Sequence, residues 1–435
     1  MLSPITDVIV SVLQPVWGYF LVFWGETWWF FLLIILLPVA RSTWIYWRQI
    51  IYQHNMKYAI LEMRIPREVT KNPRAMEQVL RAFHSMRNAA RNIREVYWDG
   101  EVTNWVSLEI VGRGGEVHLY VRCLKSRRPL VEAAFFSSYQ DVELVEVPDY
   151  AEMLPKSAEE LWDRGLDFFG GELELVKPDM YPLRTYLEFE VPDEDIQLID
   201  PISNALEILG KLTKDEFVAI QINIAPADYS WAKEWEDELA KLRKIGTKAA
   251  MEEEGGSLTT RTPGQTRILK AVEEKLGRQA FNTMGRIVYV CPKAVYSDTV
   301  PRRGLIGALN QYATADMNAF KWNFPAGTRT QLWDWPYIFP KLRGKLRKKR
   351  YWHWFIHREM PEEQWTGKLL SSHPLNWNFY SKTMHLDIAE MATIFHPPTH
   401  VVLTAPHIHR VESKKAGAPS GLPIFGDETA IDKFT

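Results

Sequence analysis

The chain begins with a long apolar stretch, before the alternation of apolar and polar residues that is typical of a folded domain. Residues 8–25 carry no charge, and after Glu26 a second uncharged run covers residues 27–40. A helix rises about 1.5 Å per residue and a hydrocarbon core is about 30 Å thick, so the second run alone is too short to span it. It spans the core if the helix continues through Arg41, whose charge can snorkel to the interface. We therefore predict one membrane span here.

The first apolar run leaves two alternatives open. Gln14, Pro15 and Gly18 interrupt it, so it forms either a second span that closes a hairpin or a helix lying in the interface. A cleaved signal peptide fits poorly, because no basic segment precedes the run and no small-residue cleavage site follows it.

Aromatic and basic residues flank the predicted span. Indole and phenol rings favour the bilayer interface, and basic residues favour the cytoplasmic side of a membrane. The side chains expected at the two interfaces are Trp24, Trp28, Trp29, Arg41, Trp44, Tyr46 and Trp47. Basic residues follow the span and none precedes it. We therefore expect an anchor in the cytoplasmic (inner) membrane, with the bulk of the chain in the cytoplasm.

After the anchor, segments with a period of two residues alternate with segments of helical period. The pattern predicts strands at residues 58–65, 106–110, 117–123 and 142–147, and helices at residues 73–86 and 129–139. In the first helix Asn72 is a good N-cap and Pro73 suits the first helical position. The apolar stripe of that helix comprises Met76, Val79, Leu80, Phe83 and Met86. This stripe predicts packing against a sheet.

The same order of elements recurs in the second part of the chain. Strands are predicted at residues 217–224 and 286–291, a helix at 304–312 and an extended piece at 317–324. The shared order predicts an α+β fold with two ferredoxin-like halves. Two further helices, marked by apolar residues at 231–242 and 268–276, predict a helical hairpin inserted at about 230–283, with its polar tip at 246–264.

These patterns divide the chain into five regions. They are the anchor, the first α+β half, the second half with its insert, a basic and aromatic connector, and a C-terminal segment with a Pro/Gly-punctuated tail, at residues 1–56, 57–155, 156–326, 327–383 and 384–435. A short helix followed by a strand is expected within residues 386–403. The glycine pairs at 114–115, 170–171 and 255–256 are interpreted as turns.

Composition narrows the possible functions. The chain is 46% hydrophobic and 24% charged, and its net charge is −2. These values are typical of globular domains, and they exclude a surface built throughout for nucleic acid. Two cysteines occur, Cys123 and Cys291, each within an alternating strand pattern. Buried, reduced thiols in a reducing compartment are the expected reading.

The run at residues 341–350 carries seven basic side chains in ten and precedes Tyr351 and two tryptophans. Basic residues neutralise the phosphates of nucleic acid or of anionic lipid, while aromatic rings stack on bases or rest among headgroups. The candidate contact residues are Lys341, Arg343, Lys345, Arg347, Lys348, Lys349, Arg350, Trp352 and Trp354. Lipid, DNA and a merely solvated loop all remain open.

No enzyme signature stands out. The sequence contains no GxxxxGK[ST] phosphate loop, GxSxG elbow or HExxH motif. A C-terminal group comprises His385, His396, His400, His407 and His409, with Asp387 and Glu390 nearby. Two prolines between His396 and His400 argue against ligands on adjacent helical turns. We expect surface or structural histidines, with no metal, no cofactor and no catalytic residues.

Three segments resemble a known family. They are YAILEMRIPREVTKNPRAMEQVLRAFH at 58–84, WVSLEIVGRGGEVHLYVRCLKSRRPLVEAAFFSSYQDVELVEVPDY at 105–150, and LDIAEMATIFHPPTHVVLTAPHIHRVESKKAGAPSGLP at 386–423. These segments, with the anchor, are similar to the N-terminal membrane region of HerA/FtsK-like conjugation ATPases, motors related to type IV secretion. The resemblance covers most of residues 28–425. In that family the region leads into an ATPase domain with Walker motifs, which this sequence does not contain, so no catalytic residue carries over.

The resemblance implies a non-enzymatic, membrane-anchored component of a type IV secretion or conjugation-like machine. Such a component would be an adaptor or docking platform for a separate ATPase, or a homo-oligomer, with the insert and the tail as contacts. Two alternatives stay open: a membrane-tethered nucleic-acid-binding module that uses the basic run, and an enzyme built around the C-terminal histidines.

Overall fold

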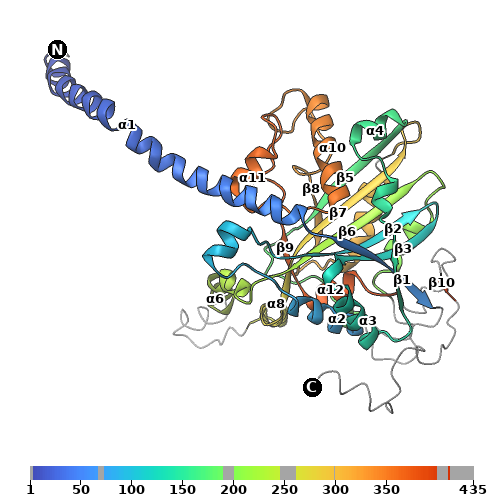
Figure 1. Ribbon diagram of the computed structural model, residues 1–435. Helices are drawn as coiled ribbons and strands as arrows, with labels where there is room; N and C mark the ends of the chain where they lie inside the picture. Colours follow the sequence, from blue (N-terminus) through green and yellow to red (C-terminus); the bar gives the residue numbers. More distant parts are fainter. Residues whose placement is uncertain are drawn as a thin grey trace, which may run out of the picture.

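The computed structural model describes residues 3–66, 73–189, 200–244, 261–297, 299–398 and 410–411. Its first element, α1 (Ser3–His54), is a single helix of 52 residues, which projects from the folded body (Figure 1). At about 1.5 Å per residue it is about 78 Å long. Among the described residues, one helical stretch, Val22–His54, is long enough and apolar enough to cross a membrane, judged by length and composition. The hairpin alternative for the first apolar run is wrong here, because the backbone stays helical through both runs.

A ten-stranded sheet forms the centre of the body. Its strand order is β10-β1-β3-β2-β6-β7-β5-β8, with β4 also paired to β1 and β9 to β7. The strands are β1 (Tyr58–Pro66), β2 (Val106–Arg113), β3 (Glu116–Leu124), β4 (Glu143–Val147), β5 (Leu166–Leu175), β6 (Phe217–Pro226), β7 (Ala280–Pro292), β8 (Phe320–Asn323), β9 (Met384–Asp387) and β10 (Arg410–Val411). All pairs are antiparallel except β1 with β10.

Two groups of four strands share one arrangement. The first group has the order β4-β1-β3-β2 and the second the order β6-β7-β5-β8. The two groups meet at the β2–β6 pair, whose register joins Val106 to Ile224 and Arg113 to Phe217. Within each group a helix follows the first and the third strand. These helices are α2 (Arg74–Ser85), α3 (Arg128–Ser138), α5 (Ser203–Gly210) and the short α9 (Ile306–Leu309).

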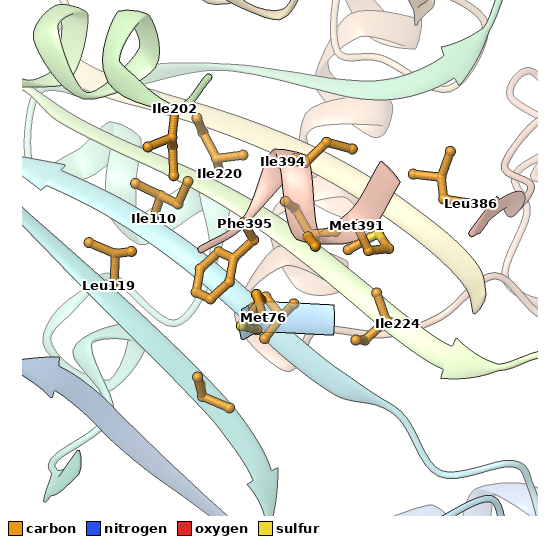
Figure 2. Packing of buried hydrophobic residues seen from close by; sticks show 14 of the residues in the cluster. Met76, Ile110, Leu119, Ile202, Ile220, Ile224, Leu386, Met391, Ile394 and Phe395 are labelled. Atoms are coloured by element: carbon orange, nitrogen blue, oxygen red, sulfur yellow. The ribbon is translucent and has the colours of Figure 1, made fainter. Parts of the chain in front are cut away.

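One face of the sheet carries the main core. The helices α2, α3 and α5 and the late helix α12 (Ile388–Ile394) bury their apolar faces against strand residues. Figure 2 shows Met76 of α2 and Met391 of α12 lying over Ile110, Ile220 and Ile224. The predicted stripe of α2 is confirmed, since four of its members are buried and Met86 packs at the margin. Asn72, its predicted N-cap, lies outside the described residues.

The opposite face is covered by α4 (Ala158–Asp163) and α10 (Pro340–His357). Central strands therefore bury both sets of alternating side chains. Ile110 and Ile220 belong to the main core, whereas their neighbours Val111 and Ala219 pack with Phe355 of α10. This two-sided burial explains why the central strands read as almost continuous apolar runs.

The prediction of a turn at residues 170–171 is wrong. Gly170 and Gly171 lie in the middle of β5, a strand that the sequence analysis did not identify. A Cβ on Gly170 would lie 2.4 Å from Cδ1 of Tyr351, and one on Gly171 would lie 2.5 Å from Cζ3 of Trp322. Glycine is needed here because aromatic rings approach the backbone from both faces of the sheet.

The remaining predictions have mixed outcomes. The two insert helices are α6 (Glu236–Lys244) and α8 (Pro263–Leu276), and their expected polar tip lies mainly outside the described residues. The short C-terminal helix is α12, while the strand expected after it lies mostly outside the described residues. Cys123 and Cys291 are buried free thiols, as predicted. The region expected to be a connector contains α10 and a short helix, α11 (Trp365–Leu370).

Candidate membrane-proximal site

The C-terminal part of α1 is seated on the body. Indole Nε1 of Trp44 donates a hydrogen bond of 2.7 Å to the backbone oxygen of Tyr97, and the hydroxyls of Ser42 and Thr366 are hydrogen-bonded. Ile45 is only 5% exposed. The helix is therefore fixed to α11 on one side and to the turn Glu95–Asp99 on the other.

Two glycines allow this close approach. A Cβ on Gly367 of α11 would lie 2.7 Å from Cδ2 of Tyr46, and one on Gly100 would lie 2.4 Å from the backbone carbon of Arg48. Gly100 also has φ +66°, a conformation that other residues adopt at a cost. The seat of α1 thus depends on residues of the body that sequence periodicity does not reveal.

The predicted interface residues divide into two groups. Trp24, Trp28 and Trp29 stay about half exposed on the projecting part of α1, and Trp47, further along the helix beside Trp44, is likewise about half exposed. Trp44 and Tyr46 contact the body instead, and the guanidinium of Arg41 lies 5.6 Å from the Tyr97 ring centre. Within the stretch Val22–His54, the residues before the seated part, 22–40, form about 28 Å of helix, which is close to the thickness of a hydrocarbon core.

A small groove beside this seat is lined by charged side chains of both signs, Glu362 and Glu363 with Lys368 and Lys382. It encloses about 190 Å³ and is lined by Gln49 and Gln53 of α1 and by residues after α10, including Glu362 and Glu363. Burial, together with the nearby charges of Glu359 and Glu363, raises the pKa of Glu362 to about 7. The Glu362 carboxyl therefore titrates near neutral pH, next to the part of α1 that is seated on the body.

The basic run forms the first half of α10, and part of it is buried. Arg343 is fully buried and donates to the backbone oxygens of Asp334 and Trp335, at 2.9 and 2.8 Å. Arg347 is 6% exposed and donates to Asn376 Oδ1 at 2.7 Å. Burial lowers the pKa of Arg347 to about 10, so it remains charged at neutral pH. These two arginines tie loops to the helix and cannot reach a ligand at the surface.

The end of the run is also paired. Lys348 Nζ lies 2.5 Å from Asp167 Oδ1, and Lys349 pairs with Glu159 of α4. Arg350 donates to the backbone oxygen of Asn376 at 3.0 Å. The interpretation of this run as a solvated loop is wrong, because it is a helix whose cations hold α10 against its neighbours.

The aromatic residues after the run are unavailable for stacking on a ligand. Tyr351 and Trp352 are fully buried and Trp354 is 6% exposed. The Tyr351 hydroxyl donates to the backbone oxygen of Gly171 at 2.8 Å, and Trp352 Nε1 donates to that of Pro155, also at 2.8 Å. The expected contact of Trp352 and Trp354 with bases or headgroups is therefore wrong: helical spacing turns them into the core beneath α10.

Near the start of α10, Lys341 and Lys345 remain exposed. So does most of a segment rich in aromatic residues, 331–342, which we call the aromatic segment. The apolar side chains of that segment that are at least 46% exposed are Leu332, Trp333, Trp335, Tyr337, Ile338, Phe339 and Leu342. The sequence analysis assigned this part of the chain to a basic and aromatic connector and did not identify the segment. Its density of aromatic residues without helical or strand period was the available signal.

An ion-pair network holds the other end of α10. The guanidinium of Arg358, 1% exposed, lies 3.0 Å from Glu109 Oε1 on β2 and 2.7 Å from Asp149 Oδ2. Burial alone would raise the pKa of Glu109. The charge of Arg358 and the hydrogen bonds that Ser107 and Tyr150 donate outweigh burial, so the pKa of Glu109 lies below its usual range. This network connects the helix that carries the basic run to the centre of the sheet.

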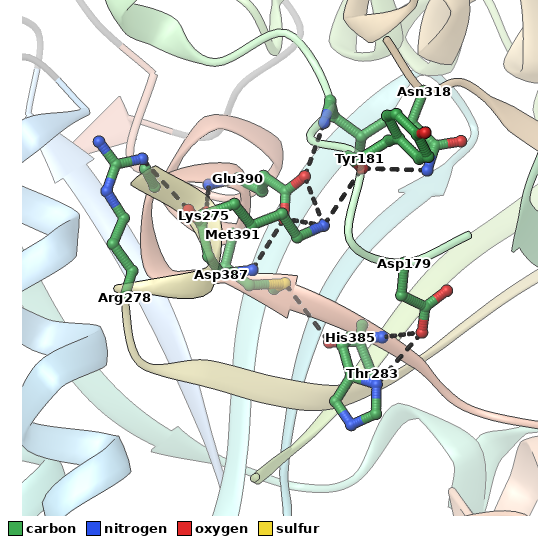
Figure 3. A network of polar contacts seen from close by, with 12 residues as sticks. Asp179, Tyr181, Lys275, Arg278, Thr283, Asn318, His385, Asp387, Glu390 and Met391 are labelled. Atoms are coloured by element: carbon green, nitrogen blue, oxygen red, sulfur yellow. Dashed lines mark hydrogen bonds and ion pairs between the residues drawn. The ribbon is translucent and has the colours of Figure 1, made fainter. Parts of the chain in front are cut away.

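The C-terminal histidines that the structure describes have structural partners. His385 Nδ1 lies 3.2 Å from Asp179, and His396 is buried 2.9 Å from Asp200. Figure 3 shows Asp387 with Arg278, and Glu390 with Lys275 at 2.9 Å. His400, His407 and His409 lie outside the described residues.

One other histidine cluster occurs among the described residues. His353 and His357, one turn apart on α10, and Glu359 offer ligand atoms within 4.8 Å of one another. The hydrogen bond that His353 Nε2 donates to the Glu359 carboxylate raises the pKa of His353, which favours an imidazolium–carboxylate pair. Both histidine side chains are exposed.

Comparison with known proteins gives a family. The model of a family described as a domain of unknown function (DUF8128) matches residues 49–318, well over half of the chain. The match begins in the seated part of α1 and ends before β8, so it covers most of the sheet but neither α10 nor the aromatic segment. No curated protein matches the chain.

Proposed function

The chain belongs to the DUF8128 family, and we propose that it is a non-enzymatic, membrane-anchored docking platform of a type IV secretion or conjugation-like translocation machine. In this proposal α1 lies in the cytoplasmic membrane and the α+β body lies in the cytoplasm, where it receives a separate ATPase. Basic residues that follow the apolar stretch support the orientation.

The observation that carries the proposal is the seat of α1 on the body. A flexible tether would need no contacts, whereas Ser42, Trp44 and Tyr46 engage α11 and the turn before Gly100. A helix that is held in this way orients the whole body relative to the bilayer. Defined orientation is what a platform for a partner requires.

We further propose that the body consists of two ferredoxin-like halves with an inserted helical hairpin. The strand orders β4-β1-β3-β2 and β6-β7-β5-β8, with helices after the first and third strand of each group, support this reading. The helices α6 and α8 of the insert pack together, and Arg243 on α6 pairs with Glu273 on α8 at 2.7 Å. Exposed residues of α6 are the contact that we assign to the ATPase.

The test uses a photo-crosslinking amino acid in the full chain in native membranes. It is placed at Lys241, exposed on α6, or, as a matched control, at Leu130, exposed on α3. We expect a crosslinked ATPase with Walker motifs, identified by mass spectrometry, from position 241 and not from 130. Recovery of the chain alone from both positions, with no ATPase after solubilisation, would count against the platform.

The nucleic-acid alternative has less support. Arg343 and Arg347 are buried, Lys348 and Lys349 are paired, and the tryptophans that would stack on bases lie in the core. A salt-dependent gel shift of the protein with single-stranded DNA would support the nucleic-acid alternative.

A further inference from the structure

The aromatic segment is an ordered structure that presents apolar side chains to solvent. Thr330 Oγ1 donates to the Pro340 backbone oxygen at 2.8 Å, and the backbone nitrogen of Gln331 donates to Asp334 Oδ2 at 2.7 Å. Arg343 adds its two bonds to the backbone oxygens of Asp334 and Trp335 from beneath. The segment is thus held in shape by polar groups that point inward.

Two residues of the segment adopt an unfavourable backbone conformation. Tyr337 has φ 65° and Phe339 has φ 46°, values in the left-handed region that residues with a Cβ seldom occupy. Tyr337 is 62% exposed and Phe339 64% exposed, so apolar burial of these side chains within this chain does not compensate for that cost. Strain of this kind is concentrated at binding and functional sites.

A basic groove lies directly beside the aromatic segment. It is open, measures about 1050 Å³ and includes Leu332 and Pro340 of the segment in its lining. Its cationic lining residues are Lys293, Arg329, Lys341, Lys345 and Lys348. Asp167, the partner of Lys348, is the one carboxylate among the described lining residues. The groove therefore carries an excess of positive charge next to exposed aromatic rings.

The position of this surface relative to the anchor indicates its ligand. In Figure 1, α10 and the chain that precedes it extend from the body on the side from which α1 leaves, with α11 between them. Contacts join α1 to α11, and Asn376, after α11, binds Arg347 of α10. Trp365 and Leu370 of α11 are also exposed apolar side chains.

We propose that the aromatic segment and the basic groove bind an anionic bilayer surface. Tryptophan, tyrosine and phenylalanine of the segment lie at headgroup depth, and the exposed Lys293, Lys341 and Lys345 of the groove bind lipid phosphates. Aromatic rings with basic neighbours are the composition that this interface favours, and α1 keeps the segment close to the bilayer at a high effective concentration. This inference rests on the proposed membrane location of α1, and it adds a second, peripheral contact that orients the body.

The experiment places one fluorescent label at a time on the full chain in proteoliposomes of phosphatidylcholine and phosphatidylglycerol that contain doxyl-labelled lipid. The native thiols do not interfere, because burial raises the pKa of Cys123 to about 11 and also raises that of Cys291. The labelled variants are Leu33→Cys in α1, Trp333→Cys in the aromatic segment and Leu130→Cys on the opposite face of the sheet.

We expect lipid quenching at positions 33 and 333 and none at 130. Quenching at 33 without quenching at 333 would overturn this inference and leave the anchor intact. Absence of quenching at 33 would overturn the membrane location and the inference with it. A label at 333 that is shielded from water but not quenched by lipid would point to a second copy or a protein partner, and would also overturn it.

A second comparison tests whether the basic groove binds lipid phosphates. Omitting phosphatidylglycerol should reduce quenching at 333, and Lys341→Gln and Lys345→Gln should each weaken the preference for anionic lipid by about fivefold. Lys382→Gln, an exposed lysine outside the groove that pairs loosely with Glu174, is the matched control. Equal quenching in pure phosphatidylcholine, or equal effects of all three variants, would overturn the assignment of the groove.

Discussion

Replacing Arg358 with methionine tests whether α10 is held to the sheet by the buried ion pair described above. Methionine keeps much of the volume but removes the cation, so the carboxylate of Glu109, 0% exposed, loses its partner. Removing one member of a buried ion pair costs about 3–5 kcal/mol, because the remaining charge stays desolvated. The bond to Asp149 adds less, since that side chain is 25% exposed. We expect a loss of about 3 kcal/mol at neutral pH.

The loss should depend on pH with a definite sign. In the native protein the pKa of Glu109 is depressed, so its contribution is present above the unfolded pKa and is lost as the pH falls through the folded pKa. Without Arg358, burial raises the pKa of Glu109 instead, so the penalty is present at neutral pH and is relieved by protonation. The stability difference between R358M and the native protein should therefore shrink from pH 8 towards pH 4.

The assay is urea unfolding of the full chain in detergent, followed by tryptophan fluorescence, since Trp352 and Trp354 lie beneath α10. Glu109→Gln in the R358M background should recover at least half of the loss, because the unpaired charge is gone. A loss below about 1 kcal/mol, no dependence on pH, or no recovery in the double variant would refute the view that this pair secures α10.

Two further substitutions test the packing and the electrostatics. Gly170→Ala places a methyl group in the ring of Tyr351 and should destabilise by about 1–3 kcal/mol, whereas Gly307→Ala, with open space around it, should be neutral or stabilising in the same unfolding assay. Equal effects of the two would contradict the close approach of the ring. Glu362→Gln removes a carboxylate whose raised pKa lowers stability progressively as the pH rises from about 4.5 to about 7. The substitution should therefore raise the melting temperature at pH 8 and have little effect near pH 4.5. A benefit that is independent of pH would show that Glu362 is not buried near its acidic neighbours.

Sequence periodicity predicted most of the elements. Apolar residues at every second position identified seven strand segments, and the stripe on α2 identified both a helix and its buried face. The uncharged stretch before Arg41 identified the helix that can cross a membrane. These features depend on neighbours along the chain, so a local pattern is enough to reveal them.

Tertiary structure decided what the basic run and the glycine pair at 170–171 do. A run of basic residues has the same sequence pattern whether its side chains face water or bind loop carbonyls. Arg343 and Arg347 are buried only because α10 packs on the sheet. Glycine similarly reads as a turn until a ring from a segment 180 residues away is found against it. The seat of α1 and the groove beside the aromatic segment also arise from contacts distant in sequence, which no local pattern of residues encodes.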